Sequence, residues 1–181
     1  LYAWFDQVMA NNPALQTAYR CRQDRIRAFK ALYRQRMSLA YQAVLRLHRS
    51  PSGFADLDQD EVADAVRALR ELDARALQRC DALRDEFSQV GPHHPAVQDM
   101  VAQLGERLDR CGSVAIAGGH VAVLLNRIRF FGLDKLLPPF LARGGVVAAW
   151  SAGAMLLSDK VVLFYDDPPE GSSEPEVLDR G

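Results

Sequence analysis

The feature that most constrains the fold is an apolar, β-branched run within residues 146–155 that ends at a serine. The run stops at Ser151, and the small residues Ala152 and Gly153 follow at once. This pattern predicts a strand, a tight turn and a helix, with the serine at the corner. Such a corner lifts the hydroxyl clear of the sheet and directs free helix N–H groups toward the atom it attacks. In the simpler alternative, Ser151 only caps the helix.

A second turn of the same kind precedes it. The apolar residues 113–117 lead to the paired glycines Gly118 and Gly119, and His120 then begins a helical pattern. Paired glycines let the backbone approach a ligand closely and present N–H donors, although an ordinary tight turn also explains them.

The segment between the two turns, residues 120–143, is helical in pattern, with breaks expected at Gly132 and at Pro138-Pro139. Strand, helix and strand in this order predict a βαβ unit with parallel strands. Because the carboxyl ends of parallel strands meet at one edge of a sheet, the two turns should lie together at a ligand site.

These residues together resemble the dipeptidase E and cyanophycinase family of serine peptidases, whose fold is related to that of class I glutamine amidotransferases. The family pattern is a Gly-Gly-Asn turn, a helix and a Ser-Ala-Gly-Ala nucleophile elbow, to which residues 118–120 and 151–154 correspond. The resemblance covers residues 112–181. It implies a partial, flavodoxin-like parallel-sheet domain at 112–181. Together with the all-helical region that the apolar spacing predicts at 1–111, the expected fold class is α/β.

The resemblance also implies roles for individual residues. Ser151 would be the nucleophile that attacks a peptide or amide bond. The N–H of Ala152 and a donor from the turn at Gly118 and Gly119 would form the oxyanion hole. His120 stands where the family has asparagine. No metal and no cofactor is expected.

The catalytic base is the least defined part of this prediction. The family's histidine and its acidic partner lie well downstream of the serine, yet no histidine follows Ser151 before Gly181. We expect both to lie beyond that position, in a longer chain, and the lack of an initiator methionine agrees with this. His120 could act as a substitute base, or it could simply start its helix.

Other polar residues have simpler explanations. Asp166 and Asp167 follow a strand-like run at 160–165 and could reach the site, but their loop composition favours a solvated turn. The other histidines are most simply surface residues: His48, His93 and His94.

Residues 1–111 show no convincing strand. Apolar residues recur at helical spacing in 14–48 and again in 59–88, and a proline and a glycine separate the two segments. We predict that they pack as an antiparallel helical hairpin, followed by a third helix at 95–110. This hairpin is a candidate surface for a protein partner or for self-association.

The first long helix is strongly basic and contains interleaved aromatic residues, which raises nucleic-acid binding as an alternative. Its aromatic residues, however, lie on the apolar stripe, so we interpret Tyr19, Phe29 and Tyr33 as core. The second helix is acidic enough to neutralise the first. With a net charge of −1, the protein has no overall positive potential that would attract nucleic acid. The charge pattern therefore argues against nucleic acid.

The cysteines Cys21, Cys80 and Cys111 are far apart and have no metal-ligand spacing. They fit a reducing compartment, so we expect a cytoplasmic protein. No run is long and apolar enough to cross a membrane.

The leading interpretation is a serine hydrolase-like α/β domain that is incomplete in this chain, because only three strands are predicted, at 113–117, 145–150 and 160–165. The rival is a non-catalytic interaction protein, in which the hairpin binds a partner and the elbow is a relic.

Overall fold

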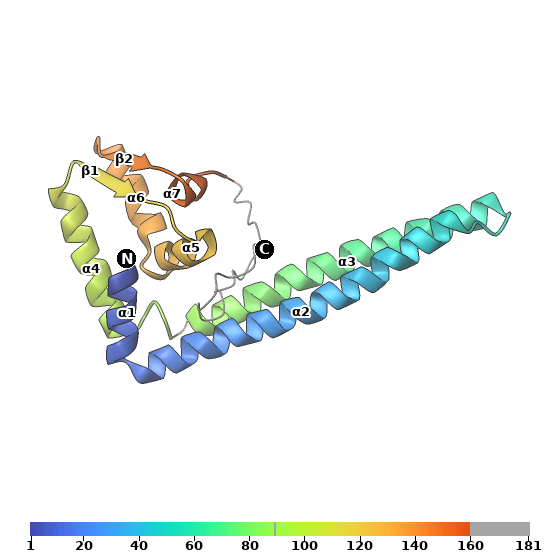
Figure 1. Ribbon diagram of the computed structural model, residues 1–181, viewed down its shortest axis with the longest axis horizontal. Coiled ribbons are helices and arrows are strands. Elements are labelled where there is room, and N and C mark those ends of the chain that lie inside the picture. The colour runs from blue at the N-terminus through green and yellow to red at the C-terminus, as the bar shows by residue number, and fades with distance from the viewer. Residues whose placement is uncertain (89, 160–181) are drawn as a thin grey trace.

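A small parallel sheet and a long helical hairpin are the two extremes of the fold, and shorter helices join them (Figure 1). The computed structural model describes residues 1–88 and 90–159 of the 181-residue chain. Within that part, helices predominate and the one sheet has two strands. The architecture is therefore of mixed α/β type.

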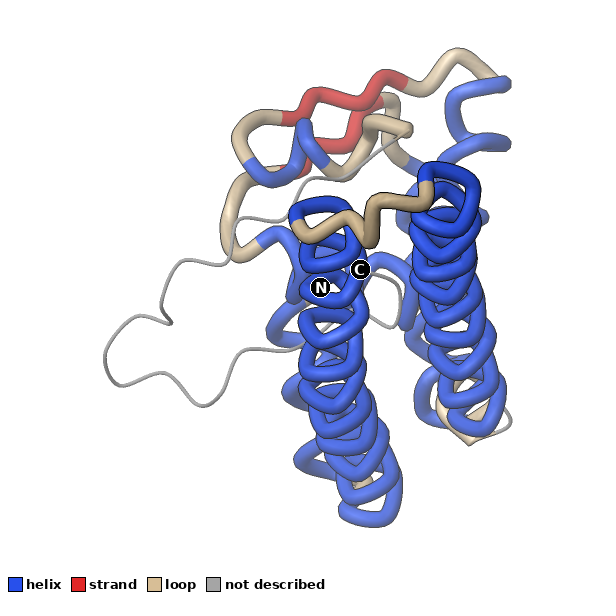
Figure 2. Tube along the Cα trace, turned by 90° about the vertical axis from the view of Figure 1, so that its right-hand side faces the viewer, coloured by secondary structure: helices blue, strands red, loops and turns tan. Residues whose placement is uncertain are grey.

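The hairpin consists of α2 (Pro13–Arg49) and α3 (Ala55–Ser88), which confirms the predicted pair of long helices. Between them Gly53, with a φ of +94°, reverses the chain. The Asp58 carboxylate accepts a hydrogen bond from the Ser52 N–H at 2.8 Å and secures this turn. The two helices lie side by side over their length, and the strands lie apart from them (Figure 2).

Burial along the hairpin changes with distance from the sheet. Near the base, Ile26 of α2 and Leu83 of α3 are buried, and Tyr19 enters the core as its place on the apolar stripe predicted. The same prediction is wrong for Phe29 and Tyr33, which stack on each other but are only half-buried, because no third described element covers the hairpin there. Between residues 27 and 71, all of which are described, no side chain is buried. The free end of the hairpin thus has an apolar stripe but no closed core of its own.

The remaining elements include the predicted βαβ unit, in which β1 (Ser113–Ile116) and β2 (Val146–Ala149) pair in parallel. The predicted strands at 113–117 and 145–150 are confirmed, while the one expected at 160–165 lies outside the described residues. The accompanying helices are α1 (Tyr2–Asn11), α4 (Pro95–Arg110), α5 (Val121–Phe130), α6 (Leu133–Ala142) and α7 (Ala152–Met155).

Aromatic packing fixes the base of the hairpin against α5. The rings of Phe5, Tyr19 and Phe130 meet edge to face, with centroids 5.0, 5.1 and 6.1 Å apart. The buried Arg127 guanidinium lies 3.3 Å from the Phe5 ring centroid and donates to the Tyr19 hydroxyl at 3.2 Å. A second apolar cluster, which includes Phe140, lies against the two strands.

One predicted helix break is wrong. Gly132, with a φ of +62°, separates α5 from α6 as expected, but Pro138 and Pro139 lie inside α6. The prolines remove two N–H donors from the helix. Burial of Leu137 and Phe140 in the cluster beside the strands offsets that loss and keeps the helix continuous.

Candidate active site

The ends of the two parallel strands bring the two glycine and serine turns together. Ile116 pairs with Ala149 in the sheet, and the Trp150 N–H donates to the Ile116 carbonyl oxygen at 3.2 Å. The residues that follow β1 and β2 therefore leave the sheet at the same edge. As a result Gly118 and Ser151 lie in direct contact.

Ser151 has an unusual backbone conformation, with a φ of 56° and a ψ of −132°. In the part of the chain that the structure describes, no other non-glycine residue has a positive φ. Such conformations cost about 1–3 kcal/mol and persist where the surrounding structure holds them. Here the Gly153 N–H donates to the Trp150 oxygen at 3.1 Å, and the Ala154 N–H donates to the Ser151 oxygen at 3.0 Å. The first turn of α7 therefore holds the exposed serine in place.

Two glycines permit the close approach of α7 to the end of β1. A Cβ atom on Gly153 would lie 2.8 Å from the Ala117 carbonyl oxygen and would overlap that of Ile116. A Cβ on Gly118 would lie 2.8 Å from Ser151 Oγ. Gly153 is thus required for backbone packing, and Gly118 leaves room beside the hydroxyl.

Backbone N–H groups border the same space. The Ala152 nitrogen would lie 3.6 Å from a Cβ on Gly118, and Ala152 begins α7, so its N–H has no acceptor inside that helix. Gly119 follows with a φ of +144°, a conformation that side-chain-bearing residues rarely adopt. The structure thus gathers Gly118, Ser151 and Ala152, with Gly119 next in the chain.

His120 caps α5 with its ring. Its Nδ1 accepts from the Val123 N–H at 3.5 Å, and the residue is exposed. Because Nδ1 acts as an acceptor, a neutral ring carries its proton on Nε2. Neither ring nitrogen then offers a lone pair to the Ser151 hydroxyl. Proton abstraction by His120 requires the ring to leave the cap.

Tyr2 lies near this corner, although nothing in the local sequence pattern singles it out. A Cβ on Gly119 would lie 3.2 Å from the Tyr2 hydroxyl oxygen, which therefore stands over the glycine turn. A hydroxyl can donate to a carbonyl or carboxylate oxygen bound there. Only the tertiary packing of α1, which lies against α4 and α5, reveals the residue.

A comparison with protein-family profiles matches peptidase family S51 to residues 70–176, more than half of the chain. This chain belongs to peptidase family S51. The match confirms the resemblance to the dipeptidase E and cyanophycinase family, and it begins in α3, upstream of the predicted start at residue 112. Neither the curated proteins nor the solved structures that were compared gave a match.

An apolar groove of about 600 Å³ adjoins the corner of this S51 chain. Its wall includes all of β1 but no residue of β2, and it reaches Gly118. Trp4 of α1, Leu108 of α4 and Leu124 of α5 line the rest. A peptide whose carbonyl group lay at Ser151 could place an apolar side chain in this groove.

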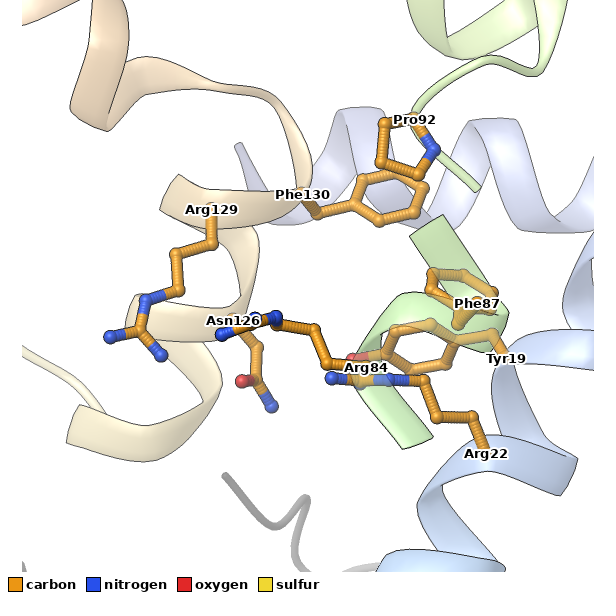
Figure 3. A pocket seen from close by; sticks show the side chains of 8 residues that line it. All are labelled: Tyr19, Arg22, Arg84, Phe87, Pro92, Asn126, Arg129 and Phe130. Carbon is orange, nitrogen blue, oxygen red and sulfur yellow. The ribbon is translucent and has the colours of Figure 1, made fainter. Parts of the chain in front are cut away.

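A smaller pocket of about 180 Å³ lies where the hairpin meets α5 (Figure 3). Arg84 of its wall also pairs with Asp81 and Asp85, both at 3.3 Å. Arg129 follows His120 by nine residues, or about 13 Å along α5, so this pocket is separate from the Ser151 corner. Its wall consists of three arginines, three aromatic residues, an asparagine and a proline: Arg22, Arg84, Arg129, Tyr19, Phe87, Phe130, Asn126 and Pro92.

The polar residues that the sequence analysis set aside do not lie at the corner in the described part of the chain. His94 caps α4, accepting from the Ala96 N–H at 3.3 Å, and His48 lies in the last turn of α2. Asp166 and Asp167 fall outside the described residues. Among residues 1–88 and 90–159, no three His, Cys, Asp or Glu side chains gather as metal ligands. None of the described helices is both long and apolar enough to cross a membrane.

Proposed function

We propose that this chain is a serine hydrolase of peptide or amide bonds, with Ser151 as its nucleophile. The strained backbone of Ser151, at a strand-to-helix corner whose hydroxyl faces Gly118, carries this proposal. Such geometry is typical of a nucleophile elbow, which exposes the serine oxygen at the end of a sheet. Membership of a family of serine peptidases supports the same chemistry.

In the proposed reaction, Ser151 Oγ attacks the carbonyl carbon of the scissile bond while a base takes the hydroxyl proton. The carbonyl oxygen becomes an oxyanion, to which the N–H groups of Ala152 and of the Gly118 and Gly119 turn donate. When the C–N bond breaks, the base returns its proton to the departing amine, and Ser151 is left as an acyl ester. Water then attacks the ester by the same route, releasing the acid and restoring the hydroxyl.

We propose His120 as the base within this chain. Its ring must first release the Val123 N–H, exchanging a 3.5 Å capping bond for contact with the Ser151 hydroxyl. The competent ring position is then a minor conformation, which lowers the rate in proportion to its population. We therefore expect slow hydrolysis. The resemblance implies a further histidine downstream, which would act without this cost.

The proposed division of the chain places the hydrolase region at residues 112–181 and a helical extension at 1–111. In this arrangement the βαβ unit is part of a flavodoxin-like sheet. The groove beside Gly118 favours peptide substrates with an apolar side chain on that side.

The second candidate function is a non-catalytic interaction protein. The engagement of His120 Nδ1 with the Val123 N–H favours it, because a serine hydroxyl without a base is a weak nucleophile. The hairpin, whose free end is exposed, would then be the functional surface.

Labelling with a fluorophosphonate, followed by mass spectrometry, distinguishes the two functions. We expect an adduct on Ser151 that disappears in Ser151→Ala and persists in Ser158→Ala, since Ser158 is an exposed serine only seven residues away. Labelling that survives Ser151→Ala unchanged would rule out the assignment. A chain that takes up no label at any serine would support the interaction protein.

A further inference from the structure

The free end of the hairpin exposes large apolar side chains. Leu32 and Leu39 of α2 and Leu57 of α3 are 60%, 68% and 51% exposed. No side chain between residues 27 and 71 is buried, and no other described element lies beside this part of the hairpin (Figures 1 and 2). Helices draw most of their stability from burying an apolar face, and here that burial is incomplete.

Leu32, Leu39 and Leu57 share one face of the hairpin. Successive residues are about 100° apart around a helix, which places Leu32 and Leu39 roughly 100–130° from the stripe that faces α3. Around the axis of α3, Leu57 is displaced by a similar angle from the stripe that faces α2. The displacement has the same sense, counted along the chain, as that of Leu32 and Leu39 in α2. Because the helices are antiparallel, both rotations lead to the same side, here called the leucine face. Leu77, which is 48% exposed, falls on the opposite side.

The two helices carry opposite charge. Helix α2 has nine arginine and lysine residues against one acid, whereas α3 has ten acids against five arginines. Arg46 and Glu61 are exposed and form no ion pair within the described residues. The Tyr33 hydroxyl donates a hydrogen bond of 2.7 Å to the Asp73 carboxylate, which shows which residues of the two helices lie at the same height. Counting from this pair places Arg46 within one residue of the height of Glu61.

We propose that two copies of this chain associate through their leucine faces into a four-helix bundle, with α2 of each copy against α3 of the other. A two-fold axis parallel to the hairpin gives this arrangement, in which all neighbouring helices are antiparallel. It brings the basic helix onto the acidic one and sets Arg46 near Glu61 of the second copy. The arrangement with α2 on α2 would instead oppose like charges.

The available area suits such a dimer. Beyond the last buried position, residues 27–49 of α2 and 55–71 of α3 project, so the two helices share a free length of roughly 25 Å. Two helices about 10 Å apart present a face roughly 20 Å wide, so each copy offers about 500 Å². A stable interface buries about 800 Å² on each partner, so this face supplies more than half of that area.

Sedimentation equilibrium on the 181-residue chain tests the interface. We expect a dimer whose dissociation constant rises about tenfold or more in Leu39→Gln, since each dimer loses two buried leucines. The matched control, Leu77→Gln, removes an exposed leucine from the opposite face and should leave the constant unchanged. Circular dichroism checks that both variants remain helical.

A charge exchange tests the arrangement. Arg46→Glu and Glu61→Arg should each weaken the dimer, and the double variant should recover it, because the cross-copy pair is then restored in reverse. A monomer at tens of micromolar would overturn the proposal and point to a different partner. Equal sensitivity to Leu39→Gln and Leu77→Gln, or failure of the double variant to recover, would overturn it as well.

Discussion

Two regions of the molecule depend on their sequences in opposite ways. One is the corner formed by Gly118 and Ser151, and the other is the free end of the hairpin. At the corner, single residues are fixed by contacts with backbone: a Cβ on Gly153 would lie 2.8 Å from the Ala117 oxygen, and Ser151 keeps a φ of 56°. Along the hairpin, apolar spacing alone defines two helices, yet no side chain between residues 27 and 71 is buried. The corner is therefore expected to tolerate little change, whereas the free end of the hairpin should tolerate more, and in the proposed dimer it would bury its exposed leucines.

The largest expected effect lies at the corner, in His120. Asparagine is a favoured N-cap residue, so His120→Asn should preserve α5, while His120→Ala loses the cap. If the ring is the base, both variants should slow ester and dipeptide hydrolysis by about 10²–10⁴-fold, measured as kcat/KM. Hydrolysis that persists in His120→Asn but not in His120→Ala would show that the ring only caps its helix.

A pair of glycine variants sharpens the contrast between tight and tolerant positions. Gly153→Ala should lower the free energy of unfolding by about 1–3 kcal/mol, because its methyl group would overlap backbone oxygens. Gly105→Ala, in α4, meets no atom within 4 Å and should raise that free energy by about 0.5–1 kcal/mol. Urea unfolding measures both values, and a Gly153→Ala protein as stable as the parent would contradict the corner geometry.

The smallest expected effect is in the hairpin, at Tyr33. Partial burial, together with the hydrogen bond to Asp73, raises the pKa of Tyr33 from 10.0 to about 12. The folded chain thus holds this proton more tightly than the unfolded chain. The resulting stability is complete below pH 10 and is lost as the pH rises toward about 12.

Phenolate absorbance during an alkaline titration checks this step. Tyr33→Phe should remove a phenolate step near pH 12 and flatten the loss of helicity above pH 10. A Tyr33→Phe titration that superimposes on that of the parent would contradict the assignment.

The fold was predictable where the pattern is periodic. Apolar spacing gave both long helices and the third helix, and β-branched runs gave β1 and β2. The error at Pro138 and Pro139 arose because burial of Phe140 overrides local proline chemistry, which no window of sequence displays.

Sequence could predict only those parts of the candidate site that directly follow the two paired strands. Gly118 and Ser151 follow strands that a βαβ unit must set side by side, so their meeting could be expected. The proximity of the Tyr2 hydroxyl to Gly119 could not, because it depends on how α1 packs. The capping bond of the His120 ring likewise depends on a side-chain rotation that sequence does not specify.

The proposed separation of the molecule into a reactive corner and an association surface is tested most directly by one double measurement. The fluorophosphonate labelling rate of Ser151 and the dimer dissociation constant are determined in Gly118→Ala and in Leu39→Gln. We expect Gly118→Ala to slow labelling on the order of 100-fold by displacing the hydroxyl, with the dimer intact. Leu39→Gln should weaken the dimer and leave the labelling rate unchanged. Gly118→Ala labelled at the parental rate, or one variant altering both quantities, would contradict the account.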